Sequence, residues 1–179
     1  MVEMEIYGVS FDLVGKMPIV LLKTTDGSRY LPIWIGHPEA AAILMKLQNA
    51  STPRPMTHDL FAETLSQLGI RVVCITVTEL RENTFYAQIT VQQDGQEVEI
   101  DSRPSDAIAL AIRTDARIYA DERVIEESGI EFEGEEGDEG AVPGEPVSLT
   151  PDQIEELTSK FKSFLDDVTP EQFAEGEEP

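Results

Sequence analysis

The chain is 179 residues long and carries 35 acidic against 13 basic side chains, which gives a formal net charge of −22. This acidic excess repels nucleic acid at long range, so contact with a polyanion requires a local basic patch or metal ions. A single cysteine excludes an intramolecular disulfide, and no apolar run approaches the length of a membrane span. We therefore expect a soluble, cytoplasmic protein with no membrane association.

The first part of the chain predicts a strand, a hairpin and a helix. Apolar residues alternate over residues 6–13, which indicates a half-buried strand. Residues 18–23 and 30–35 are predicted to pair around the turn at Asp26-Gly27, because glycine supplies the positive φ that such turns need. A helix over about residues 38–47 follows, with proline at its first position.

A second helix is predicted to begin at Thr57 as its N-cap and to run to Leu68, where Gly69 ends it. Its apolar residues recur at helical spacing, which predicts one buried face. These residues are Leu60, Phe61, Leu65 and Leu68.

The next part of the chain repeats this scheme, with a second turn at Asp94-Gly95 and a helix predicted over residues 105–113. Asp121 then caps a short helix that Gly129 ends. We interpret the chain as an internal duplication of a β-β-β-α-α unit, with copies at about residues 3–70 and 71–130. The predicted fold class is α+β, with a mainly antiparallel or mixed sheet and packed helices.

Composition changes sharply after residue 133. The predicted domain of residues 1–133 is followed by an acidic linker of Gly, Glu and Pro at residues 134–148, expected to be disordered. Residues 149–179 then predict an amphipathic helical tail, which would dock on its own core or on a protein partner. Residues 131–179 hold 16 acidic and 2 basic side chains, a net charge of −14, against −8 for the preceding part.

Glu39 and Asp106 hold corresponding places at the helix starts of the two copies. If the copies pack about a pseudo-twofold axis, these carboxylates approach one another, and such a pair can hold Mg²⁺ or Mn²⁺. The alternative is that each is a first-turn acid that complements the helix dipole, a common feature of helix starts.

Arg54, His58 and Asp59 gather at the predicted start of the second helix. Free amides, the positive helix end and an arginine together favour an anion site. The alternative is a capping acid beside a packing histidine. Arg103 and Ser105 pose the same choice, between a phosphate-binding loop and a helix start whose arginine pairs with a neighbouring acid.

No zinc spacing, Walker-type glycine loop, Rossmann fingerprint or nucleophile elbow is present, and we expect no organic cofactor. Four aromatic residues alternate within the predicted strands, and we expect them in the core rather than on a base-stacking surface. They are Tyr30, Trp34, Phe85 and Tyr86.

Three segments carry a resemblance to a known family. They are Leu-Pro-Ile-Trp-Ile-Gly at residues 31–36 with Glu-Ala-Ala-Ala-Ile at 39–43, Arg-Pro-Met-Thr-His-Asp-Leu at 54–60, and Ser-Arg-Pro-Ser-Asp-Ala-Ile-Ala-Leu-Ala at 102–111. In this order they resemble the bifunctional nuclease domain, also called domain of unknown function 151, over roughly residues 3–133. The acidic tail is similar to that of actinobacterial members. The resemblance implies an α+β domain whose plant members are described as degrading both RNA and DNA.

Position alone suggests the roles. We predict Glu39, Asp59 and Asp106 as metal ligands, and His58 as a general acid or base, because histidine is the side chain suited to proton transfer near neutral pH. We predict that Arg54, Arg103 and Ser105 bind phosphate. The first hypothesis is a metal-dependent nuclease that cleaves RNA and DNA without strong sequence specificity. The competing hypotheses are a non-catalytic homo-oligomeric module whose tail recruits a protein partner, and a domain that binds a small anionic metabolite between its two copies.

Overall fold

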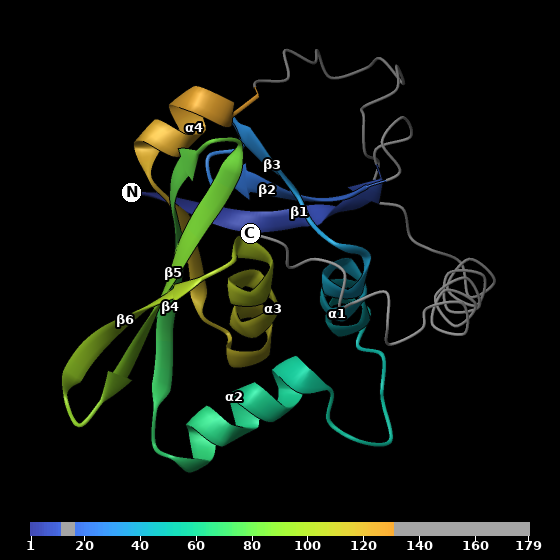
Figure 1. Ribbon diagram of the computed structural model, residues 1–179, viewed down its shortest axis with the longest axis vertical. Helices are drawn as coiled ribbons and strands as arrows, with labels where there is room; N and C mark the ends of the chain where they lie inside the picture. The colour runs from blue at the N-terminus through green and yellow to red at the C-terminus, as the bar shows by residue number, and fades with distance from the viewer. Residues whose placement is uncertain (12–16, 131–179) are drawn as a thin grey trace, which may run out of the picture. The chain divides into compact units, whose positions relative to one another are not determined.

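The computed structural model describes residues 1–11 and 17–130 (Figure 1). The strands are β1 (Val2–Phe11), β2 (Pro18–Thr24), β3 (Tyr30–Trp34), β4 (Arg71–Arg81), β5 (Thr84–Gln93), β6 (Gln96–Ser102) and β7 (Arg117–Ala120). The helices are α1 (His37–Leu47), α2 (Thr57–Gln67), α3 (Pro104–Thr114) and α4 (Glu122–Ser128). The predicted continuation of the first strand to Leu13, the linker and the helical tail lie outside the described residues.

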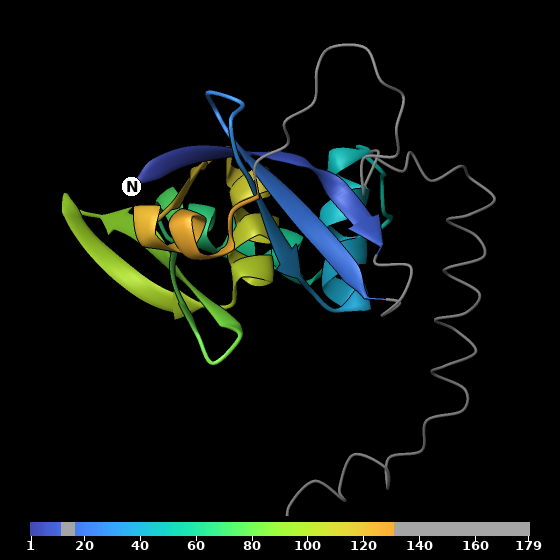
Figure 2. The same cartoon turned by 90° about the horizontal axis from the view of Figure 1, so that it is seen from above.

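The strands form one mixed, mostly antiparallel sheet in the order β3-β2-β1-β7-β4-β5-β6. Two antiparallel meanders, β1-β2-β3 and β4-β5-β6, run outward from the centre, and each is followed by a helix. The corresponding helices α1 and α3 lie side by side (Figures 1 and 2). The α+β class is therefore confirmed, and the order of elements follows the predicted duplication.

Strand β7 at the centre of the sheet is absent from the predicted scheme. It pairs antiparallel with β1 and parallel with β4, and so joins the two meanders. The second copy therefore contains four strands rather than three. The strand is only four residues long and no turn sequence precedes it, so it has no recognisable hairpin pattern.

The predicted turns and caps hold the strands in register. The Asp26 carboxylate accepts hydrogen bonds from the Ser28 amide and from the hydroxyls of Ser28 and Thr24. These hydrogen bonds, the largest from Thr24, lower the pKa of Asp26 from its ordinary 3.8 to about 2. Gly27 has a φ of +78°, as the hairpin prediction requires.

The core lies between the sheet and the helices, and α3 is the most deeply buried helix of the described part. Five consecutive residues of α3, from Ala107 to Ala111, are buried. Helix α4 contacts both the edge strand β3 and the interior strand β4. Because these strands are four positions apart in the sheet, the sheet is strongly curved.

Helix α2 differs from its prediction in two ways. Its N-cap is Met56 rather than Thr57, because the Asp59 carboxylate accepts the Met56 amide hydrogen bond at 3.0 Å. The predicted buried face is largely wrong, since Leu65 is buried but Leu60, Phe61 and Leu68 are exposed.

Trp34 also departs from its expected place in the core, because its residue surface is 53% exposed. It ends β3, an edge strand, and lies five residues before Glu39. The other three aromatic residues are half-buried: Tyr30, Phe85 and Tyr86.

Candidate active site

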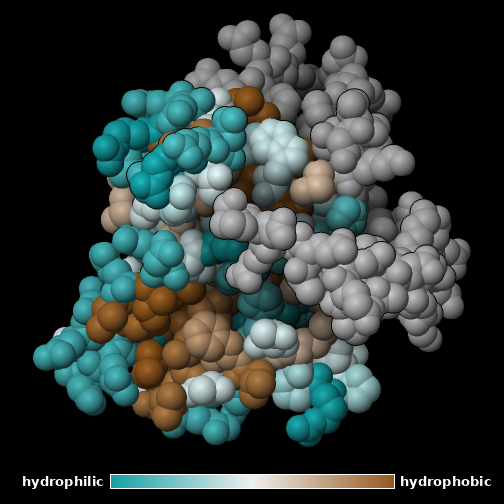
Figure 3. Space-filling view, viewed as in Figure 1, coloured by the Kyte–Doolittle hydropathy of each residue, from teal (hydrophilic) through white to brown (hydrophobic). Residues whose placement is uncertain are grey.

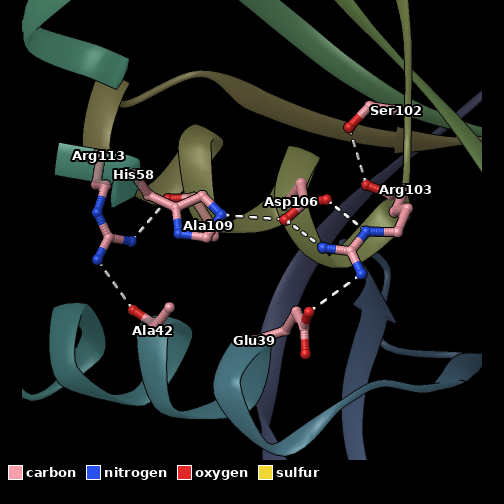
Figure 4. A network of polar contacts seen from close by, with 8 residues as sticks. All are labelled: Glu39, Ala42, His58, Ser102, Arg103, Asp106, Ala109 and Arg113. Carbon is pink, nitrogen blue, oxygen red and sulfur yellow. Dashed lines mark hydrogen bonds and ion pairs between the residues drawn. The ribbon is translucent and has the colours of Figure 1, made fainter. Parts of the chain in front are cut away.

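The first turns of three helices bring polar side chains together. Glu39 comes from the first turn of α1, His58 from that of α2, and Asp106 from that of α3. Arg103 immediately precedes α3 as its N-cap residue. Figure 4 shows these four side chains turned toward one another.

Arg103 connects the two copies through the carboxylates that correspond between them. Its guanidinium lies 3.1 Å from Glu39 Oε1 and donates to Asp106 Oδ2 at 2.6 Å and to Oδ1 at 3.1 Å. Glu39 and Asp106 therefore approach one another, as the duplication predicted. Two carboxylates face one guanidinium, so with neutral His58 this group carries a net charge of −1.

His58 lies on the other side of the Asp106 carboxylate. Its Nε2 is 3.1 Å from Asp106 Oδ1, and the side chain is only 18% exposed. The carboxylate can only accept, so the Nε2 atom carries the hydrogen of this bond. In the neutral ring this fixes Nδ1 as the free basic atom.

The surroundings of Asp106 keep it ionised. Partial burial acts to raise its pKa, but hydrogen bonds from Arg103 and His58, with the charge of Arg103, outweigh burial and lower the pKa below its ordinary value. The hydrogen bond to Asp106 in turn raises the pKa of Arg103. Asp106 is therefore an anionic hydrogen-bond acceptor for His58 over the physiological range.

Asp59 does not join this group, although it follows His58 directly. It pairs with Arg113, whose Nε lies 2.5 Å from Asp59 Oδ1. Burial acts to raise the pKa of Asp59, and the hydrogen bonds from Arg113 and the Met56 amide lower it overall.

Arg113 is a residue that the site predictions missed. Its side chain is 5% exposed and donates to the backbone oxygens of Ala109 and Ala42 at 2.8 and 3.0 Å (Figure 4). It also donates to Asp59. It therefore ties α1, α2 and α3 together and fixes the position of α2, which carries His58. The sequence feature that could have identified it is an arginine in the last turn of a helix whose other residues are mostly apolar.

A known protein family matches the part of the chain that contains these residues. A model of the bifunctional nuclease domain matches residues 20–133, which include all three helix starts. The chain belongs to the bifunctional nuclease domain family.

Relatives fall into two groups. An uncharacterized protein of Mycobacterium tuberculosis is 35% identical over 171 residues, which cover 96% of this chain and 97% of that protein. Bifunctional nuclease 1 of Oryza sativa subsp. japonica is 30% identical over 115 residues, 62% of this chain and 35% of the rice protein. Bifunctional nuclease 1 of Arabidopsis thaliana is 29% identical over 100 residues, 54% of this chain and 31% of that protein. The chain thus spans about a third of each plant nuclease.

The remaining phosphate-binding candidates differ in access. Arg54 is exposed in the loop before α2, where its backbone oxygen accepts from Thr52 at 2.8 Å. Ser105 is buried at the start of α3, so Arg54 and Arg103 are the two phosphate-binding candidates that are exposed to solvent.

The expected metal ligands are not gathered into one group. Within residues 1–11 and 17–130, no cluster of three or more His, Cys, Asp and Glu side chains could hold a metal ion. Arg103 already occupies the place between Glu39 and Asp106, and Arg113 holds Asp59 apart. These three carboxylates, as they lie, do not fit a divalent cation.

A separate cavity of about 610 Å³ is lined in part by Asp59 and Arg113. It lies among α2, the start of β4 and the end of α3, and both acidic and basic groups line it, including Lys46, Glu63, Arg71 and Asp115. None of Glu39, His58, Arg103 and Asp106 lines this cavity.

In the described part of the chain no helix is long and apolar enough to span a membrane.

Proposed function

We propose that this domain hydrolyses phosphodiester bonds in RNA and DNA without strong sequence preference. Membership in the bifunctional nuclease domain family supports the reaction class. The observation that carries the proposal is the His58–Asp106 contact of 3.1 Å at the meeting point of three helix starts. A histidine that is oriented by an ionised carboxylate is an effective general base or acid near neutral pH.

In this proposal His58 moves the proton. Asp106 holds Nε2 and stabilises the imidazolium, so Nδ1 takes a proton from the attacking water or from a ribose hydroxyl. The protonated ring then returns a proton to the leaving oxygen, which balances the reaction. Asp106 itself stays ionised throughout, as its lowered pKa favours.

Arg103 and Arg54 bind phosphate in this proposal. The Arg103 side chain is 65% exposed, so its guanidinium can exchange the Glu39 contact for a phosphate oxygen while it keeps Asp106. Arg54 lies in the loop four residues before His58 and adds a second cation. Local cations of this kind are what a chain of net charge −22 needs in order to hold a polyanion.

Dependence on Mg²⁺ or Mn²⁺ is a separate part of the proposal. Because Glu39, Asp59 and Asp106 are not gathered, we derive no catalytic step through a metal ion. Assays in Mg²⁺, in Mn²⁺ and in excess chelator distinguish a metal-dependent reaction from a metal-independent one. Activity that survives the chelator would show that the histidine mechanism is sufficient without a metal ion.

The test uses purified full-length protein on single- and double-stranded RNA and DNA, beside His58→Ala and Asp106→Asn. Asp121→Asn is a matched control, because Asp121 is also an acid at a helix start that pairs with an arginine, Arg123. We expect both site variants to lose activity and the control to keep it. Equal cleavage by all four proteins would identify a contaminating nuclease and overturn the proposal.

A non-catalytic module is the second candidate function. It is favoured by the pairing of every acid at this site with an arginine, which is also what a purely structural network of helix starts requires. Absence of cleavage on all four substrates, with and without metal, together with intact folding, would select this candidate.

The cellular setting completes the proposal. We propose a cytoplasmic location, because the single cysteine, Cys74, needs no oxidising compartment. We also propose that the segment of residues 149–179 binds a protein partner through its apolar positions. Fractionation of cells that express the full chain, and pull-downs with Phe161→Glu as the comparison, test the two statements.

A further inference from the structure

An apolar surface on α2 and β6 is left uncovered in the described part of the chain. Figure 3 shows a continuous hydrophobic region over these two elements, bordered by hydrophilic residues. We name it the α2–β6 face, and define it by the exposed side chains of Leu60, Phe61, Leu68, Val98 and Ile100.

The β6 part of this face extends the core surface of the sheet. Val98 pairs with Val91 and Ile100 with Ile89, so each lies on the same side of the sheet as its partner. Val91 and Ile89 are buried, whereas Val98 and Ile100 are exposed. The hydrophobic side of the sheet therefore continues one strand beyond its covered area.

The α2 part is an uncharged stripe. Residues 57, 60, 61, 64 and 68 are exposed and share one side of the helix by their spacing. Thr64 donates its hydroxyl to the Leu60 backbone oxygen at 2.7 Å, so it needs no further hydrogen-bond partner. Leu60 and Leu68 are 59% and 60% exposed.

We propose that the α2–β6 face is the contact surface between two copies of this chain, packed about a twofold axis. The exposed fractions of its five side chains correspond to roughly 450 Å² of apolar surface per copy. A stable interface buries about 800 Å² per partner, of which roughly 60% is apolar, or about 500 Å². These five residues alone therefore supply most of the apolar area that a stable dimer needs.

The acidic side chains of β6 disfavour edge-to-edge pairing of two copies and favour packing of one α2–β6 face on another. The other side of β6 carries Glu97, Glu99 and Asp101 in alternation, so pairing of two β6 edges would bring two acidic rows together. Packing of face on face instead brings together two uncharged helix stripes. Twofold dimers of this isologous kind are the most frequent form of self-association.

The chain's own tail is a poorer occupant than a second copy. In the tail, residues 149–179, acidic pairs at 155–156 and 166–167 interrupt the apolar positions, and the 9 acidic and 2 basic side chains give a net charge of −7. At the face itself, the α2 stripe of a second copy presents no charged side chain, whereas the apolar positions of the tail lie next to these acidic pairs in the sequence.

The test is sedimentation equilibrium of the full chain over about 1–100 μM. We expect a dimer, and we expect Leu60→Glu combined with Leu68→Glu to raise the dimer dissociation constant about 100-fold or more. Thr64→Arg, which changes only an exposed position, should act in the same direction. Trp34→Glu is the matched control on β3, the opposite edge strand, and should leave the dimer unchanged.

Circular dichroism and thermal melts confirm that each variant is folded. A wild-type monomer at 100 μM, or a dimer that survives both α2 variants, would overturn the proposal. If Phe161→Glu with Phe164→Glu converts a monomeric wild type into a dimer, the tail covers the face and a second copy does not.

Discussion

Replacing Asp106 with asparagine keeps the size of the side chain and removes its charge. In the wild-type structure this carboxylate accepts two hydrogen bonds from Arg103 and one from His58. The amide can accept through only one oxygen, and its NH₂ group would point toward one of these donors. The substitution therefore tests Asp106 as the group that orients His58.

The cost in stability should be modest. A charge-assisted hydrogen bond contributes roughly 1.5–3 kcal/mol when it is buried. Asp106 is a third exposed and Arg103 is mostly exposed, so solvent screening reduces the expected loss to about 1–2 kcal/mol. Because folding lowers the Asp106 pKa, this contribution is present above the ordinary value of 3.8 and is lost as the pH falls below it.

The cost in activity should be larger. If His58 transfers protons, loss of its orienting carboxylate lowers kcat/KM by about 100-fold or more. We expect urea unfolding at pH 7 to give Asp106→Asn a free energy of unfolding about 1–2 kcal/mol below that of wild type. This difference should shrink toward pH 3. A fall in activity no larger than that of Asp121→Asn would refute the orienting role of Asp106.

Three further predictions concern single positions. A Cβ at Gly36 would collide with the Glu39 carboxylate, so Gly36→Ala should break the Glu39–Arg103 pair. We expect Gly36→Ala and Glu39→Gln to lower the free energy of unfolding by similar amounts in urea, and the double variant to lose no more than either single variant. Arg113→Met leaves Asp59 unpaired near buried backbone, and urea unfolding should show a loss of about 3 kcal/mol, more than for any other variant proposed. Asp26→Asn should reduce stability at pH 7; because the folded-state pKa is about 2, the difference from wild type should vanish as the pH falls from 3.8 toward 2.

Local sequence patterns predicted the elements whose structure is decided locally. The turns at Asp26-Gly27 and Asp94-Gly95 fix their hairpins, because glycine takes a positive φ at both. Proline and an acid at the starts of α1 and α3 marked both helices, and the match between copies placed Glu39 near Asp106.

What the patterns missed depends on long-range packing. Hydrophobic spacing shows that α2 has an apolar side, but it cannot tell whether that side meets the chain's own core or another molecule, and here Leu65 alone of the four faces inward. Arg113 could not be assigned because its partners are 54 and 71 residues away. Asp59 followed His58 in sequence but took this distant partner.

The central strand β7 has a consequence for how the domain assembles. It is the last strand to be synthesised, yet it is the only link in the sheet between β1 and β4 among the described residues. Until residue 120 has left the ribosome, the two meanders are separate ribbons with open inner edges, and such edges are prone to aggregate. A nascent chain of which only residues 1–116 have emerged from the ribosome should therefore remain a chaperone client, and emergence of residues 117–120 should allow closure of the whole sheet.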